Sequence, residues 1–170
     1  MADNKDEIRC PACNTLMKKI FVSDRNKYVD ICVDGCGGIL FDNRELQLFD
    51  EQAEDVSEIE KELEGKTFLK PDDTIQRTCP VCNAKMIKNY SSIKKEVMID
   101  ECYTCGAKFL DNAELEKIRS EYATDAQRTE DVMRHLNAAW GSEILEAKMA
   151  AQNVKFSPGL KLVMKMFSGR

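Results

Sequence analysis

Alternating apolar and polar residues predict one β-hairpin in each half of the chain. The first hairpin pairs residues 16–22 with residues 28–32, and the second pairs residues 85–90 with residues 97–102. Apolar side chains recur in these segments at every second position, which is the period of a strand with one buried face. We therefore expect two hairpins that each turn one face toward a core.

A helix is predicted to follow each hairpin. Asp42 and Asp111 each stand three residues before a glutamate, Glu45 and Glu114, which resembles a capping box with aspartate as the cap. The first helix should then carry an apolar stripe at three- and four-residue steps on an acidic surface. The stripe consists of Leu46, Phe49, Ala53, Val56 and Leu63. This pattern favours a solvated spacer over a dedicated partner surface, and Gly65 should end the helix.

The second helix is expected to be long and to extend to about residue 153. Its apolar side consists of Leu115, Ile118, Tyr122, Ala126, Val132, Leu136, Trp140 and Ile144 or Leu145. Such a stripe must be buried by packing on the modules, by folding back near residues 141–142 or by pairing with another copy. Homo-oligomerisation through the helices is therefore one hypothesis. The basic, Met-rich tail after it is interpreted as a docking helix or as a peptide for a partner or membrane surface.

Eight cysteines form two clusters that belong to an internal repeat. A shift of 69 residues aligns Cys10-Pro11-Ala12-Cys13-Asn14 with Cys79-Pro80-Val81-Cys82-Asn83, and residues 10–46 then show 13 identities in 37 positions. The first repeat reads C-x2-C-x18-C-x3-C and the second reads C-x2-C-x19-C-x2-C. Gly35 lies inside the wider pair, where its backbone freedom could absorb the extra residue.

Each cluster has the spacing of a four-thiolate zinc site. Two cysteine hooks separated by a hairpin can place four thiolates about 2.3 Å from one tetrahedral ion. The predicted ligands are Cys10, Cys13, Cys32 and Cys36 for one zinc ion, and Cys79, Cys82, Cys102 and Cys105 for the other. The residues that follow the hooks, Asn14, Gly37, Asn83 and Gly106, readily adopt a left-handed backbone that aims amides at sulfur. A disulfide framework and iron are the alternative interpretations.

Composition and motifs favour a cytoplasmic binding protein over an enzyme. The first residues contain no apolar run and no later segment approaches the length of a membrane span, so we expect no integral membrane association. The formal net charge is −5, and two four-thiolate zinc sites would bring it to about −9, which argues against nonspecific coating of nucleic acid. With every cysteine used as a ligand, the sites are closed and structural. His135 is the only histidine, and no nucleotide-binding or nucleophile motif is present.

The motif around each cluster resembles the transcription factor IIB-like zinc-finger family, whose repeat has Cys-Pro-x-Cys, a basic hairpin and Cys-x-x-Cys-Gly-Gly-Ile-Trp-Leu-Asp-x-x-Glu-Leu. The resemblance covers residues 9–46 and 78–115. The matching segments are Cys36-Gly37-Gly38-Ile39-Leu40-Phe41-Asp42 and Cys105-Gly106-Ala107-Lys108-Phe109-Leu110-Asp111. Leu40 and Phe109 stand where the family usually has Trp. The resemblance implies zinc binding and, by analogy with transcription zinc ribbons, nucleic-acid binding.

The sequence predicts a non-enzymatic zinc-binding protein that acts as a nucleic-acid-binding or transcription-associated factor, and one alternative function remains open. Nucleic-acid binding would use cations beside aromatic rings on the hairpins, which can pair with phosphate and stack on bases. These residues are Lys18, Lys19, Phe21, Arg25, Lys27, Lys85, Lys88, Tyr90, Lys94 and Lys95. The alternative is a protein-binding adaptor or scaffold that docks on a larger machine, such as a polymerase or ribosome, through its helices and tail. The overall acidity and the helical fraction favour this alternative.

The expected fold class is small α+β: two zinc-ribbon or zinc-knuckle modules with β-hairpins, each followed by an α-helix, plus a long C-terminal helical extension. The expected domains are residues 1–46 as the first module, 47–66 as an acidic linker helix, 67–115 as the second module, 116–155 as a helical region and 156–170 as the basic tail. Each module is too small to fold on its core alone, so metal binding should drive its folding.

Overall fold

Both predicted hairpins are confirmed. The computed structural model describes residues 7–141 of the chain, which divides into two compact units, Met1–Glu121 and Tyr122–Arg170. In the first unit, β1 (Lys18–Val22) pairs with β2 (Lys27–Ile31), and β4 (Ile87–Tyr90) pairs with β5 (Met98–Glu101), all antiparallel. The expected alternation is clear in β1, where Ile20 and Val22 are buried and Phe21 between them is exposed. It is absent from β4, an edge strand whose four residues are all exposed.

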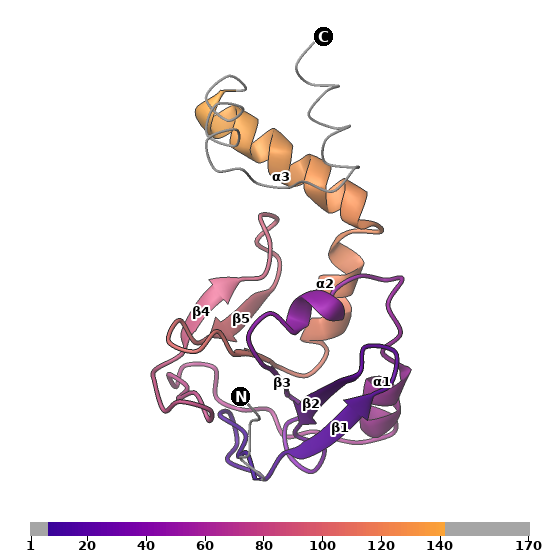
Figure 1. Cartoon of the computed structure of the whole chain (residues 1–170). Helices are drawn as coiled ribbons and strands as arrows, with labels where there is room; N and C mark the ends of the chain where they lie inside the picture. Colours follow the sequence, from indigo (N-terminus) through magenta and orange to yellow (C-terminus); the bar gives the residue numbers. More distant parts are fainter. Residues whose placement is uncertain (1–6, 142–170) are drawn as a thin grey trace. The chain divides into compact units, whose positions relative to one another are not determined.

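A short third strand in each module joins the two hairpins into one sheet. β3 (Ile39–Phe41) pairs with β2, β6 (Lys108–Leu110) pairs with β5, and β3 and β6 pair with each other. The result is a six-stranded antiparallel sheet in the order β1-β2-β3-β6-β5-β4, of which Figure 1 labels all strands but β6. The two modules therefore share backbone hydrogen bonds. Three residues are too few to show a period, so the sequence pattern does not predict these strands.

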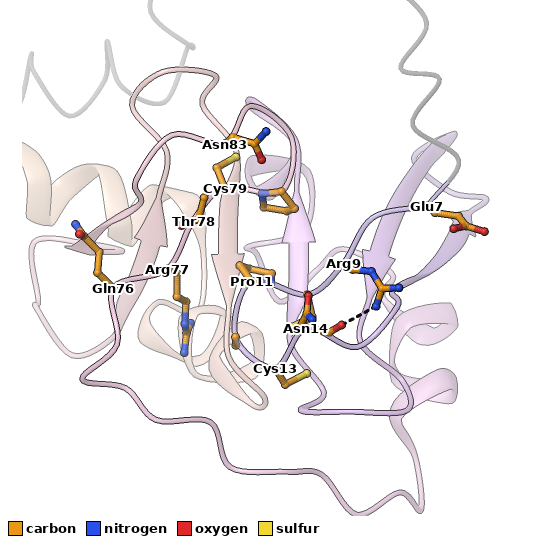
Figure 2. A pocket seen from close by; sticks show the side chains of 13 residues that line it. Glu7, Arg9, Pro11, Cys13, Asn14, Gln76, Arg77, Thr78, Cys79 and Asn83 are labelled. Atoms are coloured by element: carbon orange, nitrogen blue, oxygen red, sulfur yellow. Dashed lines mark hydrogen bonds between the residues drawn. The ribbon is translucent and has the colours of Figure 1, made fainter.

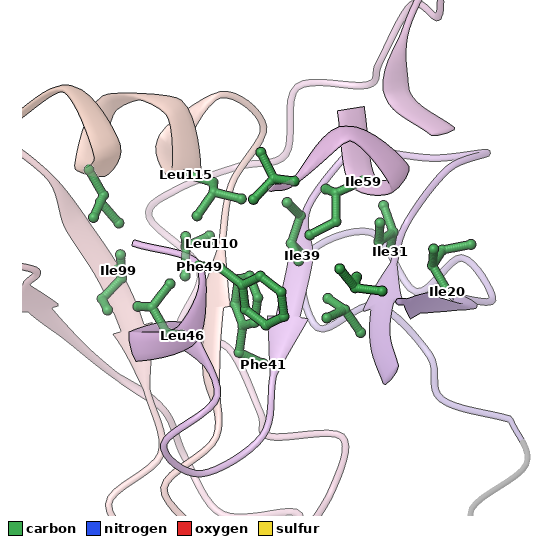
Figure 3. Packing of buried hydrophobic residues seen from close by; sticks show 14 of the residues in the cluster. Ile20, Ile31, Ile39, Phe41, Leu46, Phe49, Ile59, Ile99, Leu110 and Leu115 are labelled. Atoms are coloured by element: carbon green, nitrogen blue, oxygen red, sulfur yellow. The ribbon is translucent and has the colours of Figure 1, made fainter. Parts of the chain in front are cut away.

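The strands carry apolar residues on both faces. On one face, a core forms with residues from the 3-10 turn η1 (Leu46–Leu48), from α1 (Ser57–Leu63) and from α2 (Glu114–Glu121) (Figure 3). Phe41 and Phe49 are fully buried there, and their ring centroids lie 5.5 Å apart. A second cluster contains Leu40 and Phe109 together with cysteines from both repeats. Successive residues of a strand point to opposite faces, so β3 and β6 contribute to both clusters.

The continuous helix expected after the first module is not formed over residues 46–56. Only η1 follows the module directly, and α1 begins at Ser57. Arg119 on α2 accounts for the loop, because its guanidinium donates to the carbonyls of Phe49 at 2.8 Å, Gln52 at 3.3 Å and Glu54 at 2.7 Å. The loop wraps around the guanidinium, which satisfies carbonyls that a helix would pair with its own N–H groups.

The two capping glutamates close turns instead of starting helices at the aspartates. The Asp42 N–H donates to Glu45 Oε2 at 3.2 Å, and the Asp111 N–H donates to Glu114 Oε2 at 2.7 Å. The residue before each glutamate has a positive φ, 66° at Arg44 and 65° at Ala113. A left-handed residue cannot continue a right-handed helix, so α2 begins at Glu114.

The long second helix is divided within the described residues. α2 ends at Glu121, and α3 (Asp125–Trp140) begins after Thr124. Thr124 Oγ1 accepts from the Gln127 N–H at 3.3 Å, and Gln127 Oε1 accepts from the Ala123 N–H at 3.1 Å. These two hydrogen bonds cap the start of α3. The predicted extension to residue 153, the fold-back after Gly141 and the tail lie outside the described residues. No helix within residues 7–141 is long and apolar enough to cross a membrane.

Candidate metal centres

The structure brings the four cysteines of the first repeat together. Cys10 and Cys13 lie in the turn before β1, and Cys32 and Cys36 lie in the turn after β2. Their Sγ atoms all lie within 4.8 Å of one another. Cys10 Sγ is 3.4 Å from Cys36 Sγ, and Cys13 Sγ is 3.4 Å from Cys32 Sγ.

The second repeat builds the same arrangement from equivalent positions. Cys79, Cys82, Cys102 and Cys105 also have their Sγ atoms within 4.8 Å of one another. Cys79 Sγ lies 3.6 Å from Cys105 Sγ, and Cys82 Sγ lies 3.4 Å from Cys102 Sγ. Residues 7–141 contain no other group of three or more cysteine, histidine or acidic side chains gathered this closely. The eight cysteines predicted as ligands thus form two separate groups of four.

Four equivalent tight turns position the thiols. In each turn the residue after the second cysteine has a positive φ, and its N–H donates to the carbonyl of the first cysteine at 2.7–3.0 Å. These residues are Asn14 (61°), Gly37 (72°), Asn83 (62°) and Gly106 (81°). The left-handed turns expected from the residue types are therefore present. Both repeats use glycine or asparagine where most side chains would be strained.

Gly35 accommodates the extra residue of the first site through its lack of a side chain. A Cβ atom at this position would lie 2.7 Å from Cys32 Sγ, 2.8 Å from Cys13 Sγ and 2.7 Å from Thr15 Oγ1. Real Cβ atoms do not approach other atoms this closely, so any larger residue would push the sulfurs apart. Space, and not a left-handed backbone, is what the wider Cys32–Cys36 turn requires from glycine.

Backbone amides in both sites point at sulfur and favour the ionised thiol. The sulfur of the first cysteine in each repeat accepts from two amides, and the donors occupy equivalent positions in the two repeats. The donors are Ala12 and Cys13 to Cys10, and Val81 and Cys82 to Cys79. Burial raises the pKa of Cys79 overall, and these amide hydrogen bonds oppose the rise. They also supply part of the outer shell that a metal-bound thiolate needs.

The thiols of the first site perturb one another strongly. Hydrogen bonds with the Cys10 and Cys36 thiols lower the pKa of Cys32 to about 2. Hydrogen bonds with Cys32 and then Cys36 raise the pKa of Cys10, and burial adds to this. The first thiolate is therefore stabilised by its protonated neighbours, while further ionisation is opposed. A cation is needed before all four sulfurs can carry charge together.

The donor sets fit a tetrahedral metal ion. Sulfurs bound about 2.3 Å from a tetrahedral centre lie about 3.8 Å apart. The closest Sγ pairs in the two sites, at 3.4–3.6 Å, need little adjustment to reach that separation. They are far outside the bond length of a disulfide, which is about 2.05 Å. Either site can hold one ion through four sulfurs, without an open coordination position.

All four cations predicted for nucleic acid on the first hairpin are paired with carboxylates of the same chain. The pairs are Lys18–Glu62 (2.8 Å), Lys19–Asp30 (3.5 Å), Arg25–Glu54 (3.4 Å) and Lys27–Glu45 (3.5 Å). Phe21 and Tyr28 are instead 44% and 58% exposed, and their ring centroids lie 5.0 Å apart. The outer surface of this hairpin therefore presents two neighbouring aromatic rings beside cations that already have carboxylate partners.

The predicted residues of the second hairpin have more varied partners. Lys88 Nζ lies 3.5 Å from Asp73 and 4.0 Å from Asp100. Lys85 donates to Thr78 Oγ1 at 3.1 Å, and Lys94 donates to the carbonyl of Glu121. Lys95 Nζ lies 6.0 Å from the centroid of the Tyr90 ring. A cation next to an aromatic ring, as predicted for a nucleic-acid surface, therefore occurs on this hairpin.

Arg77 is a buried cation that the sequence did not single out. Its Nη1 lies 2.6 Å from Asp100 Oδ2, its Nη2 lies 2.8 Å from Asp111 Oδ1, and its guanidinium lies over the Phe109 ring at 5.0 Å. Only 3% of Arg77 is exposed. The equivalent residue of the first repeat is the buried Ile8. The alignment of Arg77 with Ile8 could have identified this residue, because the repeat predicts an apolar side chain at this position.

The first hooks of the two repeats line one open cavity of about 900 Å³ (Figure 2). Pro11 and Asn14 line it from the first repeat, and their equivalents Pro80 and Asn83 line it from the second. Arg9 donates to the Asn14 carbonyl at 3.1 Å within it. The duplicated hooks therefore face a common space.

Comparison with known families identifies the second repeat. Residues 78–121 match the transcription factor zinc-finger family, a TFIIB-type zinc ribbon. This segment holds the second cysteine group, β4 to β6 and α2. The first repeat adds an equivalent cysteine group over residues 10–36. Comparisons with curated proteins and with solved structures found no match.

Proposed function

We propose that this protein is a non-enzymatic adaptor that holds two structural zinc ions and binds a protein partner. The observation that carries the proposal is the pairing of the first hairpin's cations with carboxylates of the same chain, such as Lys18 with Glu62 at 2.8 Å. A phosphate that contacts one of these cations also comes close to the carboxylate paired with it, and the repulsion between the two like charges opposes binding. The exposed Phe21 and Tyr28 are side chains that protein interfaces favour.

The exposed aromatic surface is duplicated with the repeat. Phe21 is opposite Tyr28 in the register of the first hairpin, and the equivalent pair of the second hairpin is Tyr90 and Met98. Tyr90 and Met98 are 45% and 40% exposed. Aromatic residues and methionine are enriched in the buried centre of protein interfaces, which supports a protein partner.

Zinc is the proposed metal, with one ion in each group of four cysteines. The four-sulfur donor set and the zinc-ribbon match of residues 78–121 support this assignment. Closed sites leave no position for a reacting water, and His135 is exposed on α3, so the proposal includes no catalytic step. Free thiols persist in reducing compartments, which supports a cytoplasmic location. Elemental analysis of the purified chain should find two zinc ions, and iron in their place would contradict the assignment.

A transcription-associated role through nucleic acid is the second candidate. The family match supports it, as does the position of Lys95 next to the Tyr90 ring. The two candidates predict different responses to salt, because phosphate contacts weaken steeply as the salt concentration rises. Titration of the zinc-loaded chain with labelled RNA and DNA at low salt separates them. A salt-dependent shift would favour the second candidate.

Affinity capture from native cells, with and without nuclease, tests the adaptor directly. We expect a protein partner that nuclease does not remove and that the double variant Phe21→Ser/Tyr28→Ser loses. Ile75→Ser is the matched control, because Ile75 is 64% exposed outside the hairpins. Loss of the partner on nuclease treatment would refute direct protein binding.

A further inference from the structure

A groove of about 500 Å³ lies between α1 and the connection from β6 to α2. Its apolar lining consists of Ile39, Val56, Ile59, Leu63, Phe68 and Leu115. Figure 3 shows Ile39, Ile59 and Leu115 among the packed residues of the buried core. The groove is therefore continuous with the core on the helix-bearing face of the sheet, and none of the eight cysteines lines it.

The rim of the groove is acidic. Glu60 and Glu64 line it from α1, and Glu116 lines it from α2. All three are exposed, and no ion pair involves them within residues 7–141. Arg119 also lines the groove, and its guanidinium donates to three loop carbonyls, so the lining carries three carboxylates against one cation. The rim therefore carries carboxylates available to cations from outside.

We infer that this groove binds a basic amphipathic segment of a protein partner. Apolar side chains of the segment would enter the groove, and its lysines or arginines would face Glu60, Glu64 and Glu116. This is the complementarity by which amphipathic segments bind apolar grooves with charged edges. The inference rests on the proposed function and deepens it, because it names the chemistry that the partner presents.

The charge of the groove favours a basic segment over nucleic acid and over a second copy of the chain. Nucleic acid would bring phosphates toward three carboxylates, and like charges at a contact are strongly unfavourable. A second copy of the chain carries the same formal net charge of −5, so its approach is opposed at long range. A basic segment is attracted by the negative charge of both the rim and the whole chain.

Binding of a synthetic peptide to the full zinc-loaded chain tests the inference. The probe is a fluorescent amphipathic peptide of leucine and lysine, and its control has glutamate in place of lysine. In the double variant Glu60→Lys/Glu64→Lys we expect binding to weaken by about tenfold or more, and Glu116→Lys tests the opposite rim. Glu96→Lys is the matched control, because Glu96 is exposed on the β4–β5 loop and has no ion pair within residues 7–141. Circular dichroism checks that each variant is folded.

Each outcome separates the inference from the proposed function. Equal weakening by Glu96→Lys, or equal binding of the glutamate peptide, would overturn the groove assignment. A dimer in sedimentation that Glu60→Lys/Glu64→Lys dissociates would make a second copy the occupant and overturn it too. A partner captured equally by this variant and by the unmodified chain would leave the adaptor proposal standing and overturn the groove. Peptide binding without any nuclease-resistant partner would overturn the adaptor proposal alone.

Discussion

Leu40 on β3 lies directly opposite Phe109 on β6, and the two residues occupy the same position of the two repeats. The register extends this symmetry across the whole sheet. From one edge to the other, the row reads Lys19, Asp30, Leu40, Phe109, Asp100 and Lys88. An approximate two-fold axis therefore passes between Leu40 and Phe109 and relates the two modules.

Gly38 should tolerate no side chain as long as Phe109 is present. A Cβ atom at Gly38 would lie 2.2 Å from Phe109 Cζ. In the other repeat the residue equivalent to Gly38 is Ala107, and the residue equivalent to Phe109 is the smaller Leu40. We predict that Gly38→Ala lowers the free energy of unfolding by about 1–3 kcal/mol, because the ring must shift. Gly38→Ala/Phe109→Leu should recover much of this loss. Urea unfolding of the zinc-loaded chain measures both, and additive losses would contradict the contact.

Arg77 should be needed as an arginine and not only as a positive charge. Arg77→Ile copies the first repeat but leaves Asp100 buried with only Lys88 nearby, at 4.0 Å. We predict a loss of about 3–5 kcal/mol in unfolding free energy, since an uncompensated buried charge remains. Arg77→Lys should also destabilise, because one ammonium cannot reach both Asp100 and Asp111 while covering Phe109.

A second change provides the check on that mechanism. Adding Asp100→Asn to Arg77→Ile should recover part of the stability, because it removes the buried charge. Arg9→Ile, which removes an exposed arginine bonded to the Asn14 carbonyl, should cost less than about 1 kcal/mol. Equal losses for Arg9→Ile and Arg77→Ile would show that burial of the guanidinium is unimportant.

Glu114 should make the protein less stable as the pH rises. Burial raises the pKa of Glu114 to about 7, although the Asp111 N–H opposes this. The pKa of Glu114 is therefore higher in the folded protein than in the unfolded chain. Protonated Glu114 contributes fully to the free energy of unfolding below the ordinary glutamate pKa, and this contribution is lost as the pH rises through 7. We predict that Glu114→Gln is more stable than the unmodified chain at pH about 8, by an amount on the order of 2 kcal/mol.

The equivalent change in the first repeat is the matched control for Glu114→Gln. Burial also raises the pKa of Glu45, but Lys27 lies 3.5 Å from its carboxylate. Glu45→Gln should therefore gain less at high pH, because it also removes this ion pair. Both variants are compared by unfolding from pH about 5.5 to 8.5 at constant free zinc, so that thiol ionisation cancels. An unchanged pH profile in Glu114→Gln would contradict the assignment.

Cys82→Ser should remove one zinc ion and destabilise more than its own module. The second module shares the hydrogen bonds between β3 and β6 with the first, so its loss exposes the edge of β3. We predict that metal analysis finds one ion in place of two and that thermal unfolding shifts to lower temperature. Thr104→Ser, an exposed change between Cys102 and Cys105, should keep both ions. Two ions in Cys82→Ser would refute the ligand assignment.

Local chemistry could be predicted from the sequence because it depends on residues close together in the chain. Cysteine spacing placed each group of four, and the residue types of Asn14 and Gly37 indicated left-handed turns. The two hairpins followed from alternation over five or more positions. The β3–β6 pairing could not be predicted, because each strand is three residues long and its partner is 69 residues away.

The remaining differences come from contacts that are distant in sequence or from signals that compete. The stripe from Leu46 to Leu63 has helical spacing, but Arg119 pairs with carbonyls in its middle. Thr124 and Gln127 form a capping pair that the longer apolar stripe obscured. Lys18 is basic in sequence, yet Glu62, 44 residues later, lies 2.8 Å away. A hairpin that looks cationic along the chain is largely paired in space.

The approximate axis between Leu40 and Phe109 affects how anything can recognise this molecule. Because the two repeats present similar surfaces, a partner can approach the chain in two orientations that are related by this axis and make similar first contacts. Only the positions where the repeats have diverged distinguish them, such as Arg77 against Ile8 and Phe109 against Leu40. The orientation in which a partner binds is therefore determined by the residues that differ between the two repeats.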